Sequence, residues 1–303
     1  MSGAPHPSTR RGPDAVGPET FGCVVLTGGR RPDDLRLALA TLLDQASVEL
    51  DVVVVGNPWQ PSGLPAGVRG VGLPENVGIP AGRNAGVEHV DGRLLFFLDD
   101  DASLADADGL ARVAAKFAAD PALGAVQLRV ESRDDGPPLR NWVPRLRVGD
   151  RSRSGDVAAL WEGAVAIRRS VFEEVGGWPG EFRFVHEGVD LAWRVLDAGY
   201  RVHYAGDVVA RHPSHVVGRH GYSAYYGARN RVWIARRNLP APLGLLFVAT
   251  FAARTLPTLL RRRHLRAALR GYRDGLRLPC GPRRPLRAAT LWRMTRNGRP
   301  PVI

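Results

Sequence analysis

This chain of 303 residues has little cysteine, little lysine and almost no acid in its last third. Its two cysteines, Cys23 and Cys280, exclude a disulfide framework and lack the spacing of cysteine metal sites, so we expect a reducing compartment. The first 20 residues lack the apolar core of a secretory signal and are expected to form a disordered leader.

Charge is distributed unevenly along the chain. Residues 211–303 contain 20 arginines and a single acid, Asp274, whereas residues 1–210 contain 22 basic and 29 acidic residues. This asymmetry indicates a basic tail that meets an anionic surface, either lipid headgroups or nucleic acid. Because Lys116 is the only lysine, part of the arginine excess can instead reflect a coding bias.

Apolar runs alternate with helical patterns in a chain that is 44% hydrophobic and therefore able to bury a large core. The pattern predicts strands at 21–26, 50–55 and 93–98, and helices over 32–45 and 79–89. Such alternation predicts an α/β fold with a mostly parallel sheet flanked by helices. The polar segment 131–156 is expected to form a mobile loop.

An acidic cluster, Asp99-Asp100-Asp101, directly follows the apolar strand 93–98. Carboxylates at the end of a buried strand can hold a hard divalent cation, Mg²⁺ or Mn²⁺, and through it phosphate oxygens. The alternative is three solvated loop acids. We expect Asp101 to bind the metal directly, Asp99 to lie on the nucleotide side or bind through water, and His212 to complete the site.

Other polar residues lie where ligands bind in such sheets. Thr27 and Asn57 follow the first two strands, at the carboxyl ends where a nucleotide would sit. The segment 76–86 is a glycine-rich turn before a helix, and its polar residues indicate a nucleotide-facing role. The predicted donor-binding residues are Thr27, Asn57, Asn76, Gly78, Arg83, Asn84, Asp99 and Asp100.

Two carboxylates, Glu187 and Asp190, are the candidates for proton transfer. If a helix starts at Asp190, helix capping explains that carboxylate well. Glu187 comes before this helix and beside the aromatic segment 182–184, which can desolvate the carboxylate and raise its proton affinity. Glu187 is therefore the candidate base, with Asp190 as the fallback.

The order of these motifs resembles family-2 glycosyltransferases with the A-type fold, particularly bacterial rhamnosyl- and galactosyl-type enzymes of cell-surface glycan assembly. The resemblance covers residues 21–237, the implied catalytic domain, and leaves residues 238–303 as a basic helical tail. It implies inverting sugar transfer from a nucleotide diphosphate donor, assisted by Mg²⁺ or Mn²⁺. The motifs that carry it are Asn76-x-Gly78, Ala81-Gly-Arg-Asn-x-Gly86, the aspartate cluster, Trp161-Glu-Gly-Ala164, Gly176-Gly-Trp178, Glu187-x-x-Asp-Leu-x-x-Arg194, His212 and Ala228-Arg-Asn-Arg231.

The resemblance also implies residue roles. Asp99 and Asp101 resemble the metal and diphosphate aspartates, His212 the late metal-linked histidine, and Arg83 and Asn84 the donor contacts. The segment of Trp161, Glu162 and Gly163, together with Trp178, is assigned to the acceptor, although the tryptophans can equally be core residues.

Two departures from the family pattern affect these roles. The second strand ends in Gly56-Asn57 rather than Asp-Asn, so the pattern does not identify the nucleotide. Gly188 replaces the usual aspartate of a Glu-Asp pair, so either Glu187 or Asp190 is the base or transferase activity is lost.

The basic tail, residues 238–303, indicates where the protein is located and which acceptor it uses. Residues 243–252 are too short for a transmembrane span and suit an interfacial helix, with arginines 261–263 facing anionic headgroups. The alternative is a helix packed on the domain. We expect a cytoplasmic protein at the inner face of the plasma membrane, acting on a lipid-linked or polymeric glycan.

Nucleic-acid binding is disfavoured, since only Tyr272 and Trp292 occur late in the tail to stack bases. A nucleotidyltransferase with a similar sheet is a further alternative.

Overall fold

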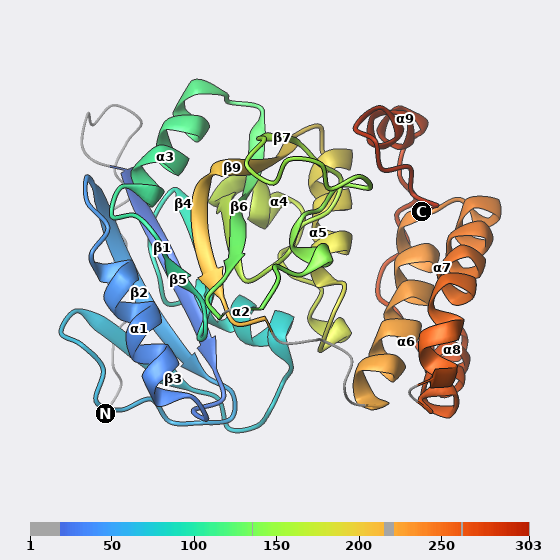
Figure 1. Cartoon of the computed structure of the whole chain (residues 1–303), viewed down its shortest axis with the longest axis horizontal. Helices are drawn as coiled ribbons and strands as arrows, with labels where there is room; N and C mark the ends of the chain where they lie inside the picture. The colour runs from blue at the N-terminus through green and yellow to red at the C-terminus, as the bar shows by residue number, and fades with distance from the viewer. Residues whose placement is uncertain (1–18, 135, 215–220, 262, 303) are drawn as a thin grey trace, which may run out of the picture.

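A central mixed sheet organises the protein, as seen in a computed structural model that describes residues 19–134, 136–214, 221–261 and 263–302 (Figure 1). Of the predicted leader, residues 1–18 lie outside the described residues, and residues 19 and 20 open the first strand. The strands are β1 (Glu19–Thr27), β2 (Val48–Gly56), β3 (Val68–Gly72), β4 (Leu94–Asp99), β5 (Ser103–Leu104), β6 (Leu123–Ser132), β7 (Gly155–Asp156), β8 (Ala164–Arg168) and β9 (Arg201–His212).

The strand order is β3-β2-β1-β4-β8-β6-β9-β5, and β7 pairs with β9. The first four strands of this order are parallel to one another, as are β6 and β9. β8 runs antiparallel to both β4 and β6. The runs 52–55 and 94–98 are buried along their length, as expected for strands covered on both faces. The predicted α/β fold with a mostly parallel sheet is therefore confirmed, with antiparallel strands added.

Helices cover both faces of the sheet. They are α1 (Pro32–Leu43), α2 (Ile79–Val87), α3 (Gly109–Ala119), α4 (Arg169–Glu174) and α5 (Glu187–Asp197). α1 and α3 pack on one face through apolar stripes such as Leu35, Leu39 and Leu42. α4 and α5 pack on the other face, in a cluster that includes Phe172 and Trp178.

The polar segment 131–156, of which residue 135 lies outside the described residues, contacts the sheet in part, and its predicted mobility stays a prediction. It contains the end of β6, a short 3-10 helix, η1 (Arg140–Trp142), and β7. The side chain of Trp142 is buried, and its carbonyl accepts a hydrogen bond of 2.8 Å from Gln127 Nε2. The buried side chain of Trp142 anchors the segment. The composition of the segment, dominated by Pro and Arg, does not indicate this anchor.

The C-terminal part is helical, as predicted. It consists of α6 (Gly221–Asn238), α7 (Ala241–Arg261), α8 (Leu265–Arg277) and α9 (Ala288–Arg296). α6, α7 and α8 lie side by side at one end of the molecule, beyond α5 (Figure 1). α9 returns to α5, where Thr290 Oγ1 donates to Asp197 Oδ1 at 2.7 Å. α6 ends at Asn238, close to the predicted domain boundary, which stays a prediction.

α7 is longer than the apolar run 243–252 suggested. Its 21 residues make it, among the described residues, a helix long and apolar enough to cross a membrane by length and composition alone. Only 11% of its most apolar window is buried. α7 therefore leaves much of its apolar surface uncovered.

Candidate active site

A cavity of about 760 Å³ opens at the carboxyl ends of the parallel strands. Most of the residues predicted from the strand ends line it, in agreement with the rule for open α/β sheets. Its polar and aromatic lining comprises Thr27, Arg31, Asn57, Asn76, Asp99, Asp100, Asp101, Trp142, Trp161, Arg183, Phe184, His212, Tyr222, Ser223 and Tyr226, with Gly28 and Gly78.

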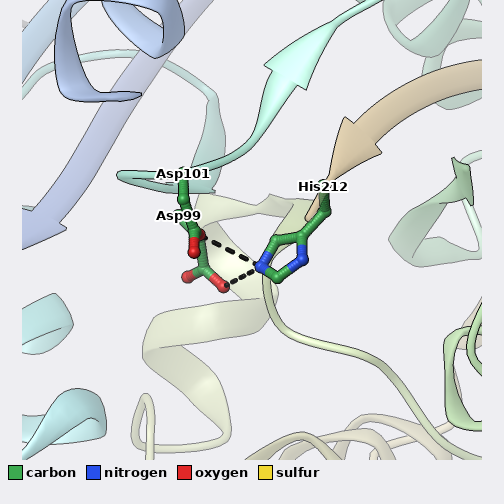
Figure 2. Close-up of side chains that lie close together, drawn as sticks. All are labelled: Asp99, Asp101 and His212. Atoms are coloured by element: carbon green, nitrogen blue, oxygen red, sulfur yellow. Dashed lines mark ion pairs between the residues drawn. The ribbon is translucent and has the colours of Figure 1, made fainter. Parts of the chain in front are cut away.

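Asp99, Asp101 and His212 converge in this cavity from the ends of β4 and β9 (Figure 2). Their ligand atoms all lie within 4.8 Å of one another. His212 Nε2 is 3.0 Å from Asp101 Oδ1 and 4.0 Å from Asp99 Oδ2. Its Nδ1 bonds the Pro213 carbonyl at 2.7 Å, so Nδ1 carries a proton and Nε2 faces the carboxylates. Two carboxylates and an imidazole in this arrangement fit a divalent metal ion.

The electrostatics of this cluster favour the proton-bound forms of both His212 and Asp100. Burial acts to lower the pKa of His212, but the hydrogen bond and charge of Asp101, helped by Asp99, raise it overall. Burial raises the pKa of Asp100 to about 6, against the opposing effects of Thr27 and Arg31. The cluster is thus held together by cations that partly neutralise its carboxylates.

Arg31 is a site residue that the sequence prediction missed. Its Nη2 is 2.6 Å from Asp100 Oδ1, and its Nη1 pairs with Asp101. The other oxygen of Asp100 accepts a 2.6 Å hydrogen bond from Thr27 Oγ1. The signal that identifies Arg31 is its place two residues after the Gly28-Gly29 turn, where the chain leaves β1 at the ligand edge of the sheet.

Asn57, Asn76 and Gly78 shape one wall of the cavity. Asn57 Oδ1 accepts from the Val77 N–H at 2.9 Å, and its Nδ2 donates to the Gly78 carbonyl at 3.0 Å. Asn76 Oδ1 accepts from the Gly78 N–H at 2.9 Å. Gly78 has a φ of 90°, and an added Cβ would lie 2.5 Å from Arg183 Cα, so only glycine fits.

Arg83, Asn84 and Trp178 lie behind the cavity wall rather than on it. The buried Arg83 donates from Nη2 to Asp99 Oδ1 at 2.6 Å and lies 5.3 Å from the centre of a Trp178 ring. Asn84 bonds the Trp178 carbonyl and N–H at 2.8 and 3.0 Å. The structure thus places Trp178 in the core, and Arg83 reaches the site only through Asp99.

The structure places Asp190 away from the cavity. α5 starts at Glu187, three residues earlier than predicted, so the capping explanation of Asp190 is wrong. Its fully buried oxygens contact Arg194 Nε at 2.8 Å, Asn238 Nδ2 at 2.7 Å and Arg237 Nε at 3.2 Å. These contacts join α5 to α6.

Glu187 and Glu162 form a pair of carboxylates behind Asp99. Glu187 is 3% exposed, and its Oε1 lies 3.7 Å from Arg83 Nη1. Burial raises the pKa of Glu187 despite the charge of Arg83. Glu162 Oε1 accepts from the Gly188 N–H at 2.6 Å, and burial together with the charge of Glu187 raises the pKa of Glu162 to about 8.

Gly188 allows the Glu162 carboxylate to approach the start of α5. A Cβ at that position would overlap the Glu162 carboxylate and lie 2.6 Å from the Leu160 carbonyl. The Glu162 carboxylate, from the segment before β8, therefore occupies the space that a side chain at position 188 would need. The predicted acceptor residue Glu162 thus lies over the start of α5.

Trp161 gives the cavity an aromatic wall. Its ring centre lies 5.2 Å from that of His212 and 6.2 Å from that of Trp142. Gly163 lies behind it, where an added Cβ would be 2.5 Å from Asp99 Oδ2. The sequence prediction missed Trp142, Tyr222 and Tyr226, although the last two share a helix face four residues apart.

Comparison with known proteins finds a family model that matches part of this chain. Residues 30–176 match the model of glycosyl transferase family 2. The chain is 31% identical over 147 residues to the O-antigen chain rhamnosyltransferase RfbN of Salmonella typhimurium. That alignment covers 45% of this chain and 46% of RfbN, so it spans less than half of the relative.

Solved structures share the fold. Mannosyltransferase PcManGT from Pyrobaculum calidifontis, in complex with GDP-Man and Mn²⁺, has a TM-score of 0.58 at 20% identity, over 88% of this chain and 89% of that one. S. aureus TarS 1-349 in complex with UDP-GlcNAc has a TM-score of 0.56 at 13% identity, over 85% and 80%. The protein therefore has the A-type glycosyltransferase fold, and its residues 30–176, just under half of the chain, are similar to glycosyl transferase family 2.

Proposed function

We propose that the protein is a metal-dependent, inverting glycosyltransferase. It moves a sugar from a nucleoside diphosphate donor to a hydroxyl of a lipid-linked or polymeric cell-envelope glycan. The observation that best supports this is the convergence of Asp99, Asp101 and His212 in the cavity of a family-2 domain. The similarity to an O-antigen chain rhamnosyltransferase supports the class of acceptor.

The metal ligands in this proposal are Asp99, Asp101 and His212. A bound Mg²⁺ or Mn²⁺ would neutralise charge that develops on the diphosphate leaving group. The imidazole ligand favours Mn²⁺, since Mg²⁺ takes oxygen ligands in a strict octahedral geometry. Arg31, which already bridges Asp100 and Asp101, adds positive charge at the same place.

The donor occupies the strand-end side of the cavity. Thr27, Asn57, Asn76 and Gly78 line that side together with the aspartates. Arg83 and Asn84 act on the donor indirectly, because they hold Asp99 and the backbone of Trp178 in place. The acceptor meets the aromatic side, at Trp161 and the segment through Glu162 and Gly163.

Glu187 is the proposed base. The acceptor oxygen attacks the anomeric carbon, its proton passes to the carboxylate, and the bond to the diphosphate oxygen breaks with its electron pair leaving on the nucleoside diphosphate. Glu162, whose pKa the charge of Glu187 helps to raise, would share the transferred proton. Asp190 stays the fallback prediction, although Arg194, Arg237 and Asn238 already bind its oxygens.

A direct test measures thermal stabilisation of the full chain by UDP, GDP, dTDP and CDP and by their sugar conjugates, with and without Mn²⁺. We expect one nucleotide to raise the melting temperature only with the metal, because a ligand of the native state stabilises it. Asp101→Asn should abolish this effect, while Asp108→Asn, at an exposed acid of the same chain, should retain it. Release of pyrophosphate from a nucleoside triphosphate in the presence of a sugar 1-phosphate would instead establish a nucleotidyltransferase.

We also propose that the protein is cytoplasmic and binds the inner face of the plasma membrane. α7 exposes Leu245 by 74% and Leu260 by 55%, next to the basic end at Arg261. Exposed leucines beside arginines suit an anionic lipid surface. Cosedimentation with vesicles containing anionic lipid, but not with neutral vesicles or with polynucleotide, is the expected result.

A further inference from the structure

A second cavity lies within the C-terminal helices. The α6–α8 cavity, as we call it, has a volume of about 310 Å³ and is lined by residues of α6, α7 and α8 and by Val185 and His186. His186 directly precedes Glu187, and Ser223 lines both this cavity and the candidate active site. The two cavities are therefore neighbours that share a wall.

The charged lining of the α6–α8 cavity is basic. Arg231 and Arg254 line it with His186 and His264, and none of the described residues that line it is acidic. Arg231 and Arg254 lie 5.0 and 5.9 Å from the centre of the same Phe251 ring. A smaller adjoining cavity brings Arg299 to the same Arg231 and His186. Three guanidinium groups thus surround one region.

Two polar atoms in this region lack partners. Arg231 Nε and Tyr272 Oη are buried and have no hydrogen-bond partner within the described residues. Burial of an unpaired guanidinium donor is unfavourable unless an anion compensates it. Burial and the charge of Arg254 lower the pKa of Arg231, which is the direction expected for a cation without a counterion.

The remaining lining supplies hydroxyl groups from Ser223 and Thr258, whereas the hydroxyl of Thr255 donates to the Phe251 carbonyl at 2.8 Å. Guanidinium and hydroxyl donors without nearby carboxylates are the groups that recognise phosphate oxygens. The same helix that carries Arg254 exposes Leu256 and Leu260 to solvent. An apolar flank beside an anion site suits a phosphate attached to a lipid.

We infer that the α6–α8 cavity binds the phosphate or diphosphate group of a lipid-linked acceptor. The sugar end of that acceptor would reach the candidate active site past Ser223, and its lipid would follow the exposed face of α7. This inference rests on the proposed function for its acceptor, but the anion site stands on Arg231, Arg254 and Tyr272.

The test uses the full chain and farnesyl diphosphate, with EDTA present so that metal-dependent binding at the aspartates does not contribute. We expect calorimetric binding of farnesyl diphosphate, with affinity lowered about tenfold or more in Arg231→Gln, since a charge-assisted contact is lost. Arg254→Gln, at an exposed position, should weaken binding without a folding defect. Arg270→Gln, at an exposed arginine of α8 outside the cavity, is the matched control.

Unchanged binding in both Arg231→Gln and Arg254→Gln would overturn the site. If inorganic pyrophosphate binds as tightly as farnesyl diphosphate, the assignment of the site to a lipid is wrong. If farnesol binds as tightly as farnesyl diphosphate, the assignment to an anion is wrong. A second measurement on Arg231→Gln, thermal stabilisation by nucleotide with Mn²⁺, separates this inference from the proposed function. If the variant loses farnesyl diphosphate binding but is still stabilised by nucleotide, the substitution has affected the α6–α8 cavity alone. If the wild type binds farnesyl diphosphate but no nucleotide, the proposed function fails and the anion site remains.

Discussion

Replacing Glu162 by glutamine should make the fold less sensitive to pH. Burial and the charge of Glu187 raise the pKa of Glu162 from 4.5 to about 8. Between these values the folded state holds more protons than the unfolded state, so the free energy of unfolding falls as pH rises. The contribution of this proton is fully present below pH 4.5 and is lost as the pH passes 8.

The size of the effect follows from the shift. One pKa unit corresponds to about 1.4 kcal/mol, so the full shift sets an upper limit of about 5 kcal/mol. Because Glu162 is partly exposed, solvent screens the charge, and we expect about 2 kcal/mol. Glutamine keeps the acceptor for the Gly188 N–H but cannot ionise. Glu162→Gln should therefore be more stable than the wild type at pH 8.5, by roughly 4 °C in melting temperature, and close to it at pH 4.

The assay is calorimetric or denaturant unfolding of both proteins from pH 4 to pH 9. Taking the difference between the proteins removes the contribution of carboxylates that do not interact with Glu162, and Glu88→Gln, at an exposed residue after α2, controls for a simple change of net charge. Parallel curves for wild type and Glu162→Gln would refute the reasoning, as would a variant that is less stable at every pH.

Two further predictions concern the same region. Glu187→Gln should leave nucleotide stabilisation nearly intact and reduce sugar transfer by about a hundredfold, the loss expected for a general base, and unchanged turnover would reject Glu187. Gly188→Ala should destabilise the fold by about 1–3 kcal/mol, because the new Cβ meets the Glu162 carboxylate and the Leu160 carbonyl. Denaturant unfolding measures this, and Glu162→Ala in the same chain should recover part of the loss by removing one of the two obstacles.

The convergence of Asp99, Asp101 and His212 could be predicted from the chain because each residue follows a strand with a clear local pattern. An apolar run such as 94–98 buries itself as a strand, and the residues that follow it must emerge at the sheet edge. Asp99 and Asp101 were placed correctly at that edge for this reason, and His212 follows a strand of the same sheet. The sequence also predicted the helical character of the C-terminal part.

The sequence by itself determined which segments become strands and helices and which polar residues follow them, since these depend on nearby residues. Only the tertiary structure decided which side chains meet. It paired Arg31 with Asp101, placed the Glu162 carboxylate over Gly188, and turned Arg83 behind the cavity wall. These contacts join residues far apart in the chain, so they depend on strand register and helix packing rather than on any local pattern. Asp190 shows the same limit, because a helix that starts three residues early moves its carboxylate from a cap position into a buried network.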